Sequence, residues 1–151
     1  MTQELFPVFD VPADLTEESE QMGRQYPPAP LWDFENGDFV KNGARQPIYG
    51  SGYDAWVQWC RKTALTQRWA HGAYGDNAGV EAEEALQEAD RNAVENALEE
   101  TITEALLADP MGRTQQVGEF QFRWYGDKLS LTCEVIGSDG NVATIDTKLI
   151  N

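Results

Sequence analysis

Apolar residues recur at helical spacing over residues 53–65. Trp56, Cys60 and Ala64 follow one another at intervals of four residues, so they share one face of a helix. The polar residues between them would then face away from the core. Residues 66–79 contain three glycines, and this composition predicts a loop or a broken strand.

A longer helical pattern covers residues 80–108. Val, Ala, Leu and Ile return every three or four positions, while Glu residues occupy the opposite face. Asp90 could cap a second segment, so a break near residues 88–91 stays open. The Asp109-Pro110 pair ends the pattern, because a residue before proline avoids the α region.

The last third of the chain alternates between apolar and polar residues, which is the period of a half-buried β-strand. Segments 117–125, 129–135 and 142–149 carry this pattern, and turn sequences at 126–127 and 138–141 separate them. They predict an antiparallel three-stranded meander with one buried face. Its last strand is a candidate edge, whose unpaired N–H and C=O groups could pair with another chain.

Residues 1–30 contain five prolines, which interrupt any periodicity and predict an extended arm. One or two helical turns are expected between Asp14 and Met22. Four apolar residues lie close to the start of the arm: Leu5, Phe6, Val8 and Phe9. They suggest that the arm docks on its own chain or on another chain.

The elements together predict an α+β fold. Asn36-Gly37 predicts a hairpin just after the arm, and Asn42-Gly43 predicts a second turn. We therefore expect an N-terminal extended arm over residues 1–30 and a single domain over residues 31–151. This domain would contain the hairpin, two to three helices and the C-terminal antiparallel three-stranded meander.

Charge narrows the range of partners. The chain has 26 acids and 11 Lys or Arg residues, a net charge of −15 and a sequence pI of about 4.2. This excess argues against binding nucleic acid or an anionic membrane surface. No apolar run is long enough to span a membrane, and the stretch Met1–Asp10 is acidic and lacks the basic region that would indicate a secretory signal. The acidic faces either steer basic partners or keep the protein soluble.

Candidate chemistry is sparse. The sequence lacks Cys-x-x-Cys, His-Glu-x-x-His, phosphate-binding and Gly-x-Ser-x-Gly motifs. The single His71 is expected to be structural, and Cys60 and Cys133 are expected to be reduced core thiols. Pairs such as Glu83 and Glu84 lie on a predicted exposed face, where nothing would raise a carboxyl pKa for acid catalysis. We expect no enzyme, no cofactor and no metal.

The order of features resembles that of a known family. From about Leu31 to Ile150 the chain is similar to the sheath initiators of contractile phage tails, baseplate wedge proteins sometimes labelled tail-lysozyme-like. The resemblance rests on the opening stretch 31–39, the signature Lys62–Trp69 with its loop 74–77, and the acidic helix ending in 105–110 before a β meander. The family commonly has an acidic residue before the arginine, where this chain has Gln67.

The resemblance implies a non-enzymatic structural role in the virion tail baseplate of a phage or tail-like particle, assembled in the host cytoplasm in six copies. Implied partners are baseplate wedge proteins and the first ring of sheath protein, with the tail tube or hub as a further candidate. Gln67, Arg68 and Trp69 are the expected wedge contact. The strand expected to pair with sheath consists of Thr144, Ile145, Asp146, Thr147, Lys148 and Leu149.

Two other hypotheses remain open at this point. The first is a soluble acidic adaptor or inhibitor that binds a basic protein. The second is a muralytic enzyme, as the older family label suggests. For Arg68, the alternative to a partner contact is a structural cation at the end of a helix.

Overall fold

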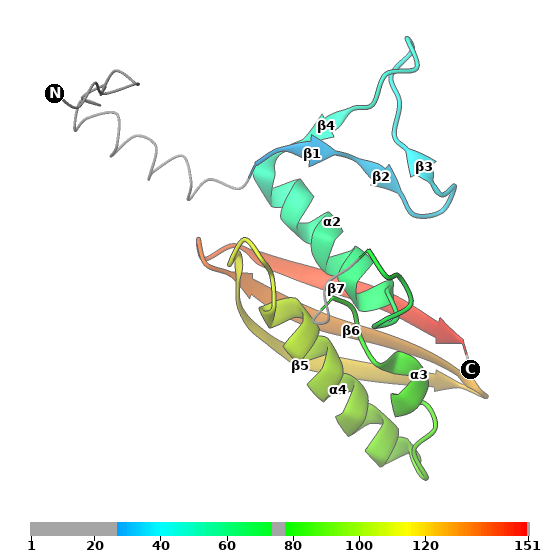
Figure 1. Cartoon of the computed structure of the whole chain (residues 1–151). Coiled ribbons are helices and arrows are strands. Elements are labelled where there is room, and N and C mark those ends of the chain that lie inside the picture. The colour runs from blue at the N-terminus through cyan, green and yellow to red at the C-terminus, as the bar shows by residue number, and fades with distance from the viewer. Residues whose placement is uncertain (1–26, 74–77, 151) are drawn as a thin grey trace, which may run out of the picture.

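A three-stranded antiparallel sheet forms the base of the structure, a computed structural model that describes residues 27–73 and 78–150. The strands are β5 (Thr114–Tyr125), β6 (Lys128–Gly137) and β7 (Val142–Ile150), with β6 in the centre. The helices α2 (Gly52–Leu65) and α4 (Arg91–Leu107) lie on one face of the sheet, and the short α3 (Ala82–Ala85) packs beside α4 (Figure 1). The α+β prediction and the predicted meander are confirmed.

Local capping sets where the helices begin. Before α2, the Ser51 hydroxyl accepts a hydrogen bond from the Asp54 N–H, and the Asp54 carboxylate accepts one from the Ser51 N–H, which forms a capping box. Before α4, the Asp90 carboxylate accepts a bond of 2.9 Å from the Ala93 N–H. The break that the sequence left open near residues 88–91 is therefore real, and α3 and α4 are separate helices.

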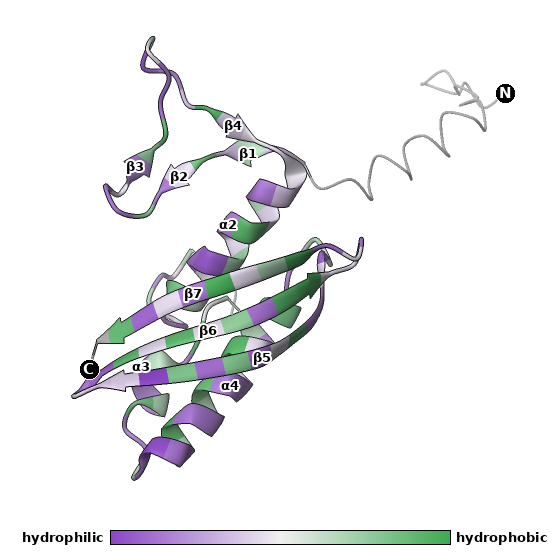
Figure 2. Cartoon of the chain, turned by 180° about the vertical axis from the view of Figure 1, so that it is seen from behind, coloured by the Kyte–Doolittle hydropathy of each residue, from purple (hydrophilic) through white to green (hydrophobic). Residues whose placement is uncertain are grey.

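The core lies between the two long helices and the inner face of the sheet. Trp56 of α2 is fully buried, and its indole N–H donates to the Thr114 hydroxyl at 3.1 Å, so its one polar atom is satisfied. Inward positions along β6 and β7 are apolar, apart from the buried Thr147, and alternate with mostly polar outward positions (Figure 2). Cys60 and Cys133 are buried free thiols, and burial raises their pKa to about 12 and about 11. They stay protonated, as core thiols do.

A second small unit, which we call the lobe (residues 29–50), projects beyond the N-terminal end of α2 (Figures 1 and 2). Strand β1 (Ala29–Pro30) pairs with β4 (Tyr49–Gly50), and β2 (Trp32–Asp33) pairs with β3 (Asp38–Phe39). Strand β1 already belongs to the lobe, inside the range that the sequence assigned to the arm. The expected helical turns at 14–22 lie outside the described residues.

Turn chemistry and one glutamine shape the lobe. The predicted hairpin turn at Asn36-Gly37 is confirmed, with Gly37 at φ 69°. The second turn is also present, but its left-handed residue is Arg45 at φ 60° rather than Gly43. Gln58 of α2 holds the lobe, because it accepts from the Trp32 N–H at 2.6 Å and donates to the Pro30 carbonyl at 3.0 Å.

The connection from α4 to β5 is locked by a buried ion pair. The Arg113 guanidinium donates to both Asp109 oxygens, at 2.8 and 3.1 Å, and the Asp109 side chain is fully buried. Burial opposes ionisation of Asp109, but Arg113 and the amides of Met111 and Arg113 donate to the carboxylate and hold its pKa below the ordinary value. The pair also forces the chain to turn after the Asp109-Pro110 stop.

We expect this ion pair to make stability depend on acid pH. Because the folded pKa of Asp109 is lowered, its contribution is present above the unfolded value of about 3.9 and is lost as pH falls through the folded pKa. Asp109→Asn should lower the unfolding free energy by about 3–5 kcal/mol at pH 7, since it removes the buried carboxylate charge that pairs with Arg113. Denaturant titrations between pH 7 and 2.5 should show this gap closing in acid, whereas a gap of constant size would contradict the assignment.

Candidate partner-binding site

The predicted wedge-contact residues lie where a loop leaves the body and returns to it. The Val80 N–H donates to the Thr66 carbonyl and the Arg68 N–H to the Val80 carbonyl, both at 2.8 Å, so residues 66–68 and 79–81 form a parallel bridge that we call the neck. Gly79 has φ 92°, and a Cβ there would lie 2.5 Å from the Thr66 carbonyl oxygen. Only glycine fits this position without a rearrangement.

Arg68 holds the neck against α4 from inside the protein. Its side chain is only 7% exposed, and Nη1 lies 3.0 Å from Glu81 Oε1 and 3.6 Å from Glu104 Oε1. Its Nε donates to the Gly79 carbonyl at 3.3 Å. Nη2 is buried and has no hydrogen-bond partner in the part of the chain that the structure describes. Because a buried guanidinium needs countercharge, the two glutamates make this position tenable.

Gln67 and Trp69 have different environments. The Gln67 amide donates to Glu84 at 2.9 Å and its carbonyl oxygen accepts from the Glu83 N–H at 3.2 Å, so it caps the first turn of α3. Trp69 is 64% exposed and has φ 61°, a left-handed conformation that is rare for bulky residues. The three residues therefore lie together at the neck, where Arg68 is buried, Gln67 is partly buried and Trp69 is exposed.

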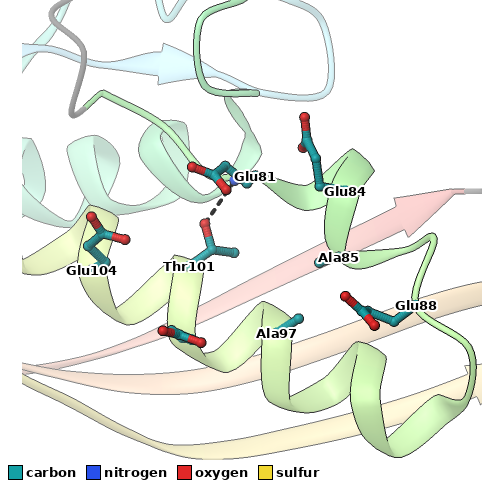
Figure 3. A pocket seen from close by; sticks show the side chains of 8 residues that line it. Glu81, Glu84, Ala85, Glu88, Ala97, Thr101 and Glu104 are labelled. Carbon is teal, nitrogen blue, oxygen red and sulfur yellow. Dashed lines mark hydrogen bonds between the residues drawn. The ribbon is translucent and has the colours of Figure 1, made fainter.

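Glutamates from two separate segments line a groove of about 250 Å³ between α3 and α4 (Figure 3). The five are Glu81, Glu84, Glu88, Glu100 and Glu104. The groove is braced where the Glu81 N–H donates to the Thr101 hydroxyl at 2.8 Å (Figure 3). Sequence reasoning treated these acids as an exposed helix face and missed the groove, because it depends on how α3 packs on α4. Over residues 27–73 and 78–150, no group of acids, His or Cys is placed to hold a metal ion.

The predicted sheath-pairing strand is β7, an edge strand. Gly137 N–H donates to the Asn141 carbonyl at 2.7 Å, which sets the phase of the β6–β7 ladder. Opposite residues in an antiparallel ladder alternate between pairs that exchange backbone hydrogen bonds and pairs that do not. Residues 143, 145, 147 and 149 therefore exchange backbone hydrogen bonds with β6. The backbone groups of the intervening residues point away from β6. Consistently, the Val142 carbonyl accepts the Tyr53 hydroxyl of α2 at 2.9 Å.

The six predicted residues therefore divide into two sets. Ile145 and Thr147 are buried and Leu149 is partly buried under the helices. Thr144, Asp146 and Lys148 are exposed, and their N–H and C=O groups face the free edge. No other strand among the described residues pairs with this side of β7.

Comparison with known proteins gives the family. Residues 30–140 match the family model of the contractile injection system sheath initiators, a range that holds all of the lobe except Ala29, the helices α2, α3 and α4, and the strands β5 and β6. Since the match covers most of the chain, the chain belongs to this family, and the resemblance seen in the sequence is confirmed. No curated protein matches the chain. In the described residues, no helix is both long and apolar enough to cross a membrane.

Family membership gives the chain a structural role in starting the sheath of a contractile injection system. It places the chain in the tail baseplate, in contact with sheath and baseplate components. This favours the structural hypothesis over the soluble adaptor and over the muralytic enzyme.

We expect Gly79→Ala to open the neck. The added methyl would clash with the Thr66 carbonyl at a left-handed position, so the unfolding free energy should fall by more than about 1 kcal/mol. Gly72→Ala is the matched control, because nothing lies within 4 Å of its Cβ position. Hydrogen exchange at the Arg68 and Val80 amides should rise in the first variant alone. Equal exchange in both variants would contradict the close approach at Gly79.

Proposed function

We propose that this chain links the baseplate wedge to the first sheath ring and starts the sheath by pairing β7 with a strand of a sheath subunit. The observation that carries the proposal is the row of backbone groups at Thr144, Asp146 and Lys148, which face an open edge. A strand added there would satisfy these groups, and main-chain pairing would supply affinity.

The surroundings of β7 favour addition of a short strand. The bond from Tyr53 to the Val142 carbonyl already occupies the beginning of the edge, so free pairing begins at Thr144. Helix α2 packs against β7, so alternate side chains of an added strand would meet this helix and fix the register. The other side chains would lie on the polar outer face of the sheet.

The wedge contact that we propose is made by Trp69, with Gln67 and Arg68 as positioning residues. A left-handed conformation costs a bulky residue about 1–3 kcal/mol, and burial does not repay it here because the ring is largely exposed. Arg68 lies 5.9 Å below the ring and holds the neck in place. An exposed tryptophan held in a fixed position is typical of the residues that contribute most to protein–protein binding.

On this proposal the chain acts without catalysis and is built into the tail in the host cytoplasm, at the copy number of its family. The acidic groove beside the neck would face a basic segment of the wedge, since a row of carboxylates steers positive charge. Trp69 and the groove together would bind wedge on one side of the molecule, which leaves β7 for the sheath.

We expect Asp146→Pro to block sheath attachment. Proline removes the outward N–H, which β6 does not use, and edge strands tolerate proline. Sheath assembly on isolated baseplates should fall by about tenfold or more, because an unsatisfied backbone partner costs about 1–3 kcal/mol. Asp146→Ala is the control, since it shares the loss of the side-chain bond to Thr132 and keeps the N–H. The number of sheathed tubes is counted by electron microscopy. Equal numbers for the two variants would contradict the strand-pairing proposal.

We expect Trp69→Asn to weaken wedge binding without unfolding the protein. Asn tolerates the left-handed conformation, whereas removal of an anchoring tryptophan should lower affinity by about tenfold or more. Tyr125→Ala is the control, because Tyr125 is equally exposed, at 65%, but lies on β5. Pull-down with wedge protein and thermal melts measure the two effects.

Arg68→Ala should lower both the melting temperature and the binding of wedge protein. A loss of binding with an unchanged melting temperature would make Arg68 a direct contact.

A further inference from the structure

An apolar groove crosses the lobe where it meets α2. It has a volume of about 330 Å³, within the range of pockets that hold apolar side chains or small ligands. Its lining consists of Ala29, Pro30, Trp32, Phe34, Phe39, Gln58 and Lys62. The Trp32 and Phe39 rings meet edge to face at 5.0 Å and remain 37% and 42% exposed. The walls are therefore already formed, and their aromatic surface is left open among the described residues.

Positive charge borders this groove on the α2 side. Lys62 forms part of the lining, and the guanidinium carbon of Arg61 lies 4.8 Å from the centre of the Phe34 ring. In a chain with net charge −15, two adjacent cations beside an apolar groove favour an occupant that is apolar in the middle and acidic at its ends.

The arm contains a segment of this kind. Residues 5–9 read Leu-Phe-Pro-Val-Phe, and Glu4 and Asp10 flank them directly. The described chain begins at Pro27, two residues before Ala29 in the groove wall. The 17 residues of segment 10–26 have a contour length of at most about 60 Å, so the length of the chain allows residues 5–9 to reach the groove.

We propose that residues 5–9 of the arm occupy the groove of their own lobe. A tethered segment has an effective concentration in the millimolar range, so a chain's own arm outcompetes the arm of a second copy at ordinary protein concentrations. Docking would bury the exposed rings of Trp32 and Phe39 and set Glu4 or Asp10 beside Arg61 and Lys62. This inference does not depend on the proposed role of β7 or Trp69.

Disulfide trapping in the full chain tests the proposal. Val8→Cys with Ala29→Cys places one thiol in the segment and one in the groove wall. Glu18→Cys with Ala29→Cys is the reference pair. The native thiols do not compete, because both are buried and protonated. From loop length alone, the reference pair would close about 2–3-fold faster, since its loop has 11 rather than 21 residues.

Docking of residues 5–9 in the groove would reverse the order of the two closure rates. The Val8→Cys pair should form its intrachain disulfide at least about tenfold faster than the reference pair. Loop length alone predicts the opposite order. Adding Phe6→Ser and Phe9→Ser should abolish the advantage, and adding Leu15→Ser should preserve it. If the Val8→Cys pair closes no faster than the reference, the proposal is overturned. Disulfide-linked dimers as the main product at micromolar protein would also overturn it, because the groove would then take the arm of a second copy.

Discussion

Burial of a single face of the sheet by α2 and α4 is the constraint on which the rest of the structure depends. Trp56, Leu131 and Ile145 meet in this layer, where each fully buried side chain contributes about 1.5–3 kcal/mol. A slip of β7 by one residue would turn Asp146 and Lys148 into the core, so the register has one stable solution. The same register decides which backbone groups face the open edge.

Two buried arginines show different uses of the same side chain. Arg113 makes a two-pronged pair with Asp109, whose oxygens also accept backbone N–H groups, and this pair locks a turn. Arg68 shares one nitrogen between two glutamates and keeps Nη2 without a partner among the described residues. The left-handed Trp69 follows it directly. Such departures from local preference concentrate at functional sites, and this supports the proposal that Trp69 contacts the wedge.

The family match and the two proposed docking segments divide the chain. Residues 30–140 carry the match, and they contain α2, α3 and α4, nearly all of the lobe, β5 and β6. The arm segment 5–9 and β7 lie on either side of that range. The matched part thus provides most of the apolar groove and the strands β5 and β6, whereas β7 carries the free edge of the sheet and the arm carries the segment that would dock. The functional contacts proposed for this chain depend on both parts.

Local period and turn chemistry determined much of this protein from its sequence alone. The faces of α2 and of the strands, the Asp90 cap and the Asn36-Gly37 hairpin all follow from neighbours within a few residues. Only the tertiary structure decided that β1 joins the lobe, that Arg68 is buried against Glu104, and that glutamates of α3 and α4 share a groove. These contacts join segments far apart in the chain, and no local pattern encodes which remote segments meet.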